Sequence, residues 1–557
     1  MSSSSNRLPI AIVLLLICPI VAVAHAAEIH VDASNMSGME DGSPAFPYTT
    51  IQQGIVHAAA GDKVRVAAGV YKEAVLMTDG VSVIGAGWRT TFIDATGLSA
   101  SAVVFDATRL SPLLSGFTIT GGEGDQRSEI GDDPVTFGGG ILILDSSPLI
   151  LDNRIVANVV EEGHCFGGGI YVSAQNSAPQ IRGNIISGNT AESLTIPGNG
   201  RGGAIFASVK DGSVTIEQNV IETNRAIDGG GIVIENLSGA AATIRRNRLI
   251  GNRGKFGAAV WLMDADDSTT EVANNLFVDN GSAQAGARGA GVLAFSSANG
   301  FFRIINNTFA DNALDQGDGA ALALDDSQAI VTDALVANNI VYQNEALTGG
   351  GIEYTAFGGT IRSNALFANA GGDLYEAGGS TATLIGNVVA DPGLAGTAIN
   401  PYRLSSTSPL IDSAADDVSP SDDLDGLSRP FDGDGDLTAA ADFGASEFPA
   451  RTIDGVRFLS SVEIEWDAEL ADVSYQLYRG SLAVLRATGN YTQDPISEPL
   501  AARDCDLLPS DLPVVDGFAP PPSVALFYLV SLEIGAYTGG LGLGPDGYER
   551  PNAFTCP

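Results

Sequence analysis

Apolar and polar residues alternate in short runs through the middle of the chain, and these runs return at a nearly constant spacing. The clearest marker is the string Asn-x-apolar-x-x-Asn, which recurs at intervals of 25 to 35 residues. Its eight copies begin at Asn153, Asn184, Asn219, Asn247, Asn275, Asn307, Asn339 and Asn364. A repeat of this length predicts a solenoid, in which each copy buries its apolar side chains against its neighbours.

A second motif lies between the asparagine strings. It is a run of glycine and alanine that ends in an aliphatic residue. The eight aliphatic residues are Ile141, Ile170, Ile205, Ile232, Val260, Val292, Leu322 and Ile352. Two residues after each stands another apolar residue or alanine, which is the alternation of a strand with one buried face. Three residues before each stands glycine, which predicts a turn with positive φ or a close backbone approach.

These patterns predict an all-β chain built around a right-handed parallel β-helix, with equivalent residues of successive coils about 4.8 Å apart. The two asparagine columns would form amide ladders that satisfy backbone groups at the turns. Strand-like segments upstream, among them 63–67 and 81–84, extend the stack toward the N-terminus. Residues 48–60 predict a short helix, beginning near Thr49 or Thr50, that covers the open end of the stack.

The repeat stops after Pro449. Segments 462–466, 474–479 and 526–530 alternate like the short strands of a small β-sandwich. The expected units are a signal peptide (1–26), an N-terminal strand and capping helix (27–60), the β-helix (61–400), an acidic closing segment (401–449) and the β-sandwich (450–557).

Residues 1–26 have the three parts of a secretory signal peptide. Arg7 precedes an apolar run, and Ala24-His25-Ala26 places small residues at the cleavage positions. A membrane anchor is the alternative, but the run is short and Pro19 interrupts it. No later segment reaches the roughly 18 apolar residues of a membrane span. We therefore expect a secreted or cell-surface protein, present as a monomer.

The chain is strongly acidic. It has 557 residues and a formal net charge of −38. Such a charge repels nucleic acid and anionic membranes, whose binding requires basic patches. A well-solvated surface is the simplest explanation of the excess.

Three cysteines follow the signal peptide. Cys505 and Cys556 lie in one C-terminal segment and are expected to form a disulfide in an oxidising compartment. Cys165 is then left over, and we interpret it as a buried free thiol rather than a nucleophile.

One acidic loop predicts a metal site. Asp432, Asp434 and Asp436 alternate with glycine, and Asp442 follows. Alternate aspartates on a flexible loop direct hard oxygen ligands toward one point, as Ca²⁺ requires. A calcium ion here would stiffen the junction before the C-terminal unit. A solvated acidic turn is the alternative.

The outward surface of the repeated strand is the second candidate site. One residue after the aligned aliphatic residue stand Tyr171, Phe206 and Trp261, and four residues before it stand Arg201 and Asp228. Ladder pairing and ring stacking that stabilise the solenoid are one interpretation. An elongated carbohydrate-binding groove is the other.

Catalysis requires further groups. A lyase that acts on uronates needs a cation beside the sugar carboxylate and a positioned base. Arg245, Arg246 and Arg248 form the main basic cluster of the predicted rod and are the weak candidates for this role. A glycosidase needs two opposed carboxylates, and no such pair stands out.

Several strings resemble known families. Ile29 to Asp32, Pro47 to Gln52, Gly61 to Val64 and Gly69 to Glu73 are similar to the start of secreted bacterial pectate-lyase-like β-helix proteins. The glycine and Phe-x-x-Asn strings resemble those of chlamydial polymorphic outer membrane proteins, which are autotransported adhesins. Residues 408–447 look like the module that closes many bacterial surface β-helices. The segment after 450 resembles a fibronectin type III domain, with Trp466 and Tyr528 as core aromatics.

These resemblances imply the fold and leave activity open. The expected function is a non-catalytic exported rod that binds glycans or a cell or matrix surface. The alternative is a Ca²⁺-assisted polysaccharide lyase, epimerase or hydrolase.

Overall fold

The structure is a computed structural model that describes most of the chain between residues 26 and 538. The gaps are 131–132, 265–266, 297–299, 326–333, 395–401, 406, 432, 434–437, 449–455, 461, 467–473, 489–490, 496, 519, 522–523 and 535–536. The signal peptide, Asp432, Asp434, Asp436 and Cys556 lie outside the described residues.

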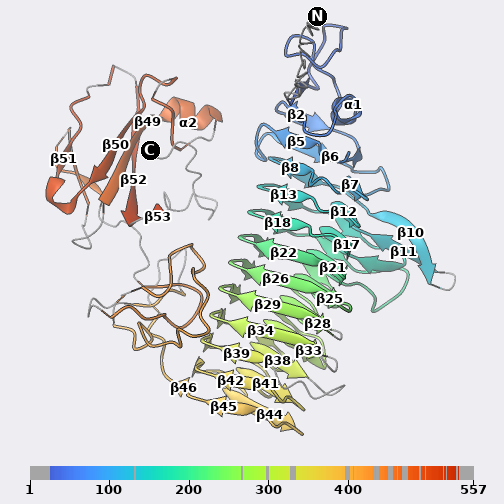
Figure 1. Ribbon diagram of the computed structural model, residues 1–557, viewed down its shortest axis with the longest axis vertical. Helices are drawn as coiled ribbons and strands as arrows, with labels where there is room; N and C mark the ends of the chain where they lie inside the picture. Colours follow the sequence, from blue (N-terminus) through green and yellow to red (C-terminus); the bar gives the residue numbers. More distant parts are fainter. Residues whose placement is uncertain are drawn as a thin grey trace, which may run out of the picture.

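The main part of the chain is a parallel β-helix, drawn as the tall stack of strands in Figure 1. Its coils build three long sheets. Sheet 1 has 13 strands, from β1 (Glu28–Val31) to β45 (Thr383–Ile385), and sheet 3 has 12, from β3 (Gly69–Tyr71) to β46 (Val388–Val389). Sheet 2 has 11 strands and carries the candidate site. Its strands are β4 (Val75–Leu76), β7 (Val103–Asp106), β12 (Ile141–Leu144), β17 (Ile170–Gln175), β21 (Ile205–Lys210), β25 (Ile232–Asn236), β28 (Val260–Asp264), β33 (Val292–Ser296), β38 (Leu322–Asp325), β41 (Ile352–Thr355) and β44 (Leu374–Gly378).

Strand register explains the repeat. The aligned aliphatic residues pair directly, for example Ile170 with Ile205 and Ile205 with Ile232, and all three are buried in one continuous core. The glycine three residues earlier has positive φ in every copy, 70° at Gly202, as predicted. A Cβ atom at Gly202 would lie 2.6 Å from the carbonyl oxygen of Ile205, so the turn excludes larger residues.

The asparagine ladders are confirmed. Asn247 Nδ2 donates to Asn275 Oδ1 at 3.0 Å and to the carbonyl of Ile216 at 2.9 Å, while its Oδ1 accepts from the backbone N–H of Asn219. The same contacts recur from coil to coil, and a second ladder contains Asn252. Because these amides are fully buried, each hydrogen bond avoids the penalty of an unsatisfied polar group.

The N-terminal end is capped as expected. Helix α1 (Ile51–Val56) begins after Thr50, whose side chain accepts from the backbone N–H of Gln53 in a capping box. The Glu73 carboxylate accepts from the N–H groups of Ile51 and Gln52, which is favourable at a helix N-terminus. Ile51 and Ile55 are buried, and they close the core at this end.

One element was not predicted. Strands β10 (Asp125–Ile130) and β11 (Asp133–Phe137) form an antiparallel pair that projects sideways from the stack beside sheet 2 (Figure 1). Strand β11 continues into the stack by pairing with β16 (His164–Phe166).

Residues 402–448 form the closing segment. It folds back along the outer face of sheet 3, where Leu404, Leu410 and Phe443 pack against Ile340 and Ala365. In Figure 1 it is the orange loop region beside the lower coils. It was predicted as a closing unit, but its attachment to the side of the rod was not.

The C-terminal unit consists of two antiparallel sheets. One contains β47 (Arg457–Phe458), β48 (Glu463–Glu465) and β51 (Val514–Val515), and the other contains β50 (Ala502–Leu507), β49 (Ser474–Ser481), β52 (Leu526–Ile534) and β53 (Tyr537–Thr538). Trp466 and Tyr475 are buried between them, and Tyr528 packs against this core. Helix α2 (Leu482–Thr488), which was not predicted, follows β49. The arrangement is that of a small β-sandwich.

Candidate functional site

The outer face of sheet 2 carries a row of large apolar side chains outside the central core. Strand register places Tyr171 beside Phe206 and, two strands further, Trp261. The rings of Tyr171 and Phe206 are parallel, 1° apart in tilt, with centroids 5.6 Å apart. The row forms its own apolar cluster together with Val233, Leu293 and Ala323.

A second row runs beside the first, at the residues just before the turn that leads into each strand. Phe137 and Phe166 lie there, with ring centroids 5.8 Å apart. Phe137 also contacts Tyr171 at 4.6 Å, and Phe166 contacts Phe206 at 5.0 Å. The two rows thus form one aromatic patch next to the projecting hairpin β10–β11.

Exposure separates the members of this patch. Phe206 is 3 % exposed and Trp261 9 % exposed, so that their faces are occupied by neighbouring side chains. Tyr171, Phe137, Phe166 and Phe256 are partly exposed. Stacking that stabilises the solenoid therefore accounts for Phe206 and Trp261, whereas the partly exposed rings can meet a ligand.

Arg201 and Asp228 lie on neighbouring coils, as the alignment predicts. Arg201 Nε lies 3.9 Å from Asp228 Oδ2, and the guanidinium also lies over the Trp261 ring at 5.3 Å. Burial raises the pKa of the Asp228 carboxyl, and the charges of Arg201 and Lys255 partly offset this effect. The pair supplies charged hydrogen-bonding groups at the edge of the aromatic patch.

Arg288 does not pair with Asp318, although strand register makes them neighbours. Its Nη1 donates to Asp325 instead, and its Nη2 lies 3.1 Å from Glu353 Oε1. Burial raises the pKa of Glu353, and Arg288 lowers it. The sequence interpretation missed this cluster, although Glu353 occupies the outward position that holds aromatic residues in earlier coils.

Carboxylates of the closing segment form ion pairs with two arginines of the basic cluster of the rod. Arg246 Nη1 lies 3.2 Å from Asp422, and its side chain is only 12 % exposed. Arg248 lies 2.7 Å from Asp425, and Arg245 pairs with Glu217 at 2.8 Å. These arginines are thus engaged in ion pairs and do not form an open cationic site.

Asparagine side chains at one corner of the rod hold the same segment. Asn274 donates to the carbonyl of Asp422, Asn306 to that of Asp442 and Asn338 to that of Ala415. Each has positive φ and directly precedes a ladder asparagine. The only sign of these contacts in the sequence is that each of the three asparagines forms an Asn-Asn pair with the ladder asparagine that follows it.

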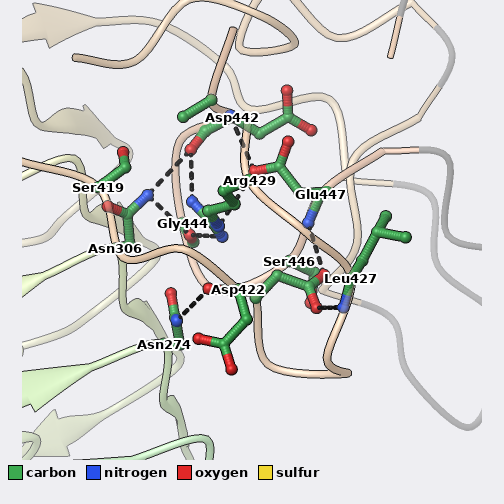
Figure 2. A network of polar contacts seen from close by, with 12 residues as sticks. Asn274, Asn306, Ser419, Asp422, Leu427, Arg429, Asp442, Gly444, Ser446 and Glu447 are labelled. Carbon is green, nitrogen blue, oxygen red and sulfur yellow. Dashed lines mark hydrogen bonds and ion pairs between the residues drawn. The ribbon is translucent and has the colours of Figure 1, made fainter. Parts of the chain in front are cut away.

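A buried charged network lies inside the closing segment (Figure 2). Arg429 and Glu447 form an ion pair of 3.1 Å, and Arg429 also donates to the carbonyls of Asp442 and Gly444. Burial raises the pKa of Asp423 to about 6, of Asp442 to about 7 and of Glu447 to about 8. The Arg429 charge lowers all three in part.

Asp442 is the one predicted calcium ligand within the described residues. Its Oδ1 accepts from the N–H of Asp412 and its Oδ2 from the N–H of Phe448. In the part of the chain that the structure describes, no three His, Cys, Asp or Glu side chains are grouped to hold a metal ion. Asp442 thus holds the backbone of the closing segment through both of its carboxylate oxygens. As a calcium ligand it would have to use the lone pairs that are not engaged in these two hydrogen bonds.

Cys165 is buried and free, as expected. Burial raises the pKa of its thiol to about 12, which is opposite to the shift of an activated nucleophile. The Cys505–Cys556 disulfide stays a prediction because Cys556 lies outside the described residues.

Comparison with known proteins supports the fold. The family model described as the right handed beta helix region matches residues 135–309. No curated protein matches the chain. Within the described residues, no helix has the length and apolar character needed to cross a membrane.

Solved structures with a similar fold include three polysaccharide-degrading enzymes. The catalytic unit of an α-1,3-glucanase from Streptomyces thermodiastaticus strain HF3-3 is 17 % identical, with 66 % of this chain and 69 % of that chain covered and a TM-score of 0.34. The polygalacturonase of Erwinia carotovora is 13 % identical, with 66 % of this chain and 97 % of that chain covered and a TM-score of 0.29. Pectate lyase Pel9A is also 13 % identical (76 % and 97 %, TM-score 0.29). At these identities and TM-scores, the similarities support no conclusion about this chain.

Proposed function

We propose that this protein is an exported, non-catalytic β-helix rod that binds polysaccharide along the outer face of sheet 2. The observation that carries the proposal is the patch of partly exposed aromatic rings, Phe137, Phe166 and Tyr171, which lies outside the core and beside the Arg201–Asp228 pair. It would extend across neighbouring coils, as binding of an extended chain requires.

The chemistry of the patch suits sugars. A pyranose ring has apolar C–H faces that pack on aromatic rings, and hydroxyl groups at its edge that need hydrogen-bonding partners. Aromatic residues supply a large contact area at little entropic cost, and Tyr171 adds a hydroxyl. Arg201 and Asp228 supply a donor and an acceptor on adjacent coils.

Two observations favour binding over catalysis. The arginines that would serve a lyase, Arg245, Arg246 and Arg248, are engaged with carboxylates, two of which belong to the closing segment. Cys165 is buried and its pKa is raised.

Hydrolysis is the second candidate, because Asp325 and Glu353 are carboxylates on neighbouring strands and face the same side. The raised pKa of Glu353 suits a general acid. Arg288 joins both groups, however, and occupies the space between them. We therefore place hydrolysis second, and a Ca²⁺-assisted lyase or epimerase third.

Binding is tested by affinity electrophoresis of the mature protein through gels that contain soluble polysaccharides. We expect retardation by at least one of them and about a two- to tenfold loss of affinity in Tyr171→Ala, since a stacking contact of an aromatic ring contributes on the order of 0.5–1.5 kcal/mol. Phe367→Ala is the matched control, because Phe367 is a partly exposed, stacked aromatic on sheet 3. Shortened chains or new ultraviolet absorbance from unsaturated uronate ends would instead establish an enzyme.

We also propose that the acidic loop with Asp432, Asp434, Asp436 and Asp442 binds Ca²⁺ and stiffens the junction before the C-terminal unit. That unit would act as a spacer of the fibronectin type III kind, with the Cys505–Cys556 disulfide. Ca²⁺ titration followed by calorimetry tests this proposal, with an Asp434→Asn, Asp436→Asn double variant as the control. Equal heats of Ca²⁺ binding in the unaltered protein and in the double variant would show that these aspartates do not form the site.

A further inference from the structure

The charges on the outer face of sheet 2 point to the class of polysaccharide. We infer that this face takes a chain that carries free amino groups in preference to a neutral one, and that it rejects polyuronates. The inference rests on the proposed function and specifies its ligand.

The arginines of this face are already engaged in ion pairs. Arg201 pairs with Asp228, and Arg288 pairs with Asp325 and Glu353. Arg127 of the hairpin pairs with Asp106 and Asp125, and Lys255 lies 5.1 Å above the Phe256 ring, whereas Lys210 is exposed at the end of β21. At the three arginines, a uronate carboxylate could obtain a cationic partner only by displacing a carboxylate of the protein.

Carboxylates exceed cations on the same surface. Glu235 faces outward on β25, two residues beyond Val233, and Asp318 lies beside Arg288 at the preceding turn. Against the five cations Arg127, Arg201, Lys210, Lys255 and Arg288 stand eight carboxylates. They are Asp106, Asp125, Asp145, Asp228, Glu235, Asp318, Asp325 and Glu353.

The excess of carboxylates also acts on the aromatic patch itself. Burial, together with the charges of Glu235 and Asp145, raises the pKa of the Tyr171 hydroxyl to about 12. Both carboxylates therefore act on this ring, although Arg201 is on the next coil. A sugar ammonium bound over this ring would be attracted by the same carboxylates that repel a uronate.

The local charges of the face account for the selection among polysaccharides more directly than the net charge of −38 does. Screening limits the range over which exposed charges interact to about 10 Å at 0.1 M salt. Removing charge from the face should thus alter selectivity, whereas removing the same charge from another sheet should not.

The test compares three oligosaccharides of equal length: a glucosamine oligomer with free amino groups, a glucose oligomer and a galacturonate oligomer. Affinities are measured by calorimetry on the full mature protein at pH 6 in 20 mM and 300 mM salt. We expect the amino oligomer to bind at least tenfold more tightly than the glucose oligomer at low salt, with the ratio falling toward one at high salt. The galacturonate oligomer should bind least.

Variants locate the effect. Glu235→Gln with Asp318→Asn should narrow the amino-to-neutral ratio several-fold, whereas Glu271→Gln, which removes a charge from sheet 1, should leave the ratio unchanged. The salt dependence of the unaltered protein decides the inference even where a variant fails to fold.

The outcomes are distinguishable. Preferred binding of the galacturonate oligomer, or an amino-to-neutral ratio of one at low salt, would overturn the charge inference and leave the binding rod intact. Absence of binding to all three oligomers and to the panel of polysaccharides would overturn the proposed function together with this inference.

Discussion

Arg429 and Glu447 form an ion pair from which solvent is completely excluded. Their Nε and Oε1 atoms lie 3.1 Å apart, and neither side chain has any exposed surface. The guanidinium also binds two backbone carbonyls of the closing segment. Two residues 18 positions apart thus supply the central contact of a segment that has no helix or sheet to order it.

Removing one partner of this pair should release the closing segment. Arg429→Ala removes the cationic partner of Glu447 and a donor to the carbonyls of Asp442 and Gly444, and the loss of a buried ion-pair partner costs about 3–5 kcal/mol. We expect limited proteolysis within residues 402–448 at a temperature at which the unaltered protein resists. Arg362→Ala is the control, because Arg362 pairs with the well-exposed Asp417 and such pairs contribute about 0–1 kcal/mol. Equal protease resistance of both variants would contradict the prediction.

The same segment should be less stable at alkaline than at mildly acidic pH. Burial raises the pKa values of Asp423, Asp442 and Glu447 to about 6, 7 and 8, so the folded segment holds protons that the unfolded chain has lost. The state that binds more protons is favoured at low pH, and stability therefore falls as the pH rises from about 5 to about 8.5. The other charged groups that face these carboxyls are Arg429, Asp412 and Asp425.

The measurement is the melting temperature, or the rate of proteolysis within 402–448, at each pH across this range. Glu447→Gln cannot ionise and should flatten the upper part of the profile. A stability that rises between pH 5 and pH 8.5 would show that these carboxyls are ionised in the folded protein. Although burial opposes ionisation of Asp425, the charges of Arg403 and Arg248 lower its pKa, so Asp425 contributes only at more acidic pH.

A single ladder asparagine should matter more in the middle of the stack than at its end. Asn247→Ala leaves the N–H of Asn219 and the carbonyl of Ile216 buried without partners, at about 1–3 kcal/mol for each unsatisfied group. Asn387→Ala is the matched control, because Asn387 ends the ladder and is partly exposed. Urea unfolding of the two variants gives the difference, and equal midpoints would argue against a cooperative ladder.

Cys165 should resist thiol reagents while the protein is folded. The thiol is buried and its pKa is raised to about 12, so the reactive thiolate is scarce at neutral pH. Labelling of the folded protein with a maleimide at pH 7.5 should be negligible, and unfolding in urea should expose the thiol. Rapid labelling of the folded chain would indicate an accessible thiolate and reopen a chemical role for Cys165.

The sequence by itself determined the β-helix. Its evidence was local and repeated: one glycine per coil with positive φ, one alternating strand, and two asparagines at a fixed separation. Every coil presents the same steric and hydrogen-bonding problem, so the same solution returns and becomes visible as a period. The helix that follows Thr50 was predicted for a similar reason, because its cap lies within three residues.

Only the tertiary structure decided which side chains are accessible and which charges meet. Tyr171, Phe206 and Trp261 occupy equivalent positions in the repeat, yet packing buries Phe206 and Trp261 and leaves Tyr171 partly exposed. Arg246 and Asp422 are 176 residues apart, and their pairing depends on the path by which the closing segment returns along the rod. A one-dimensional pattern records the chemistry of each coil, whereas burial and charge pairing depend on what lies beside the coil in space.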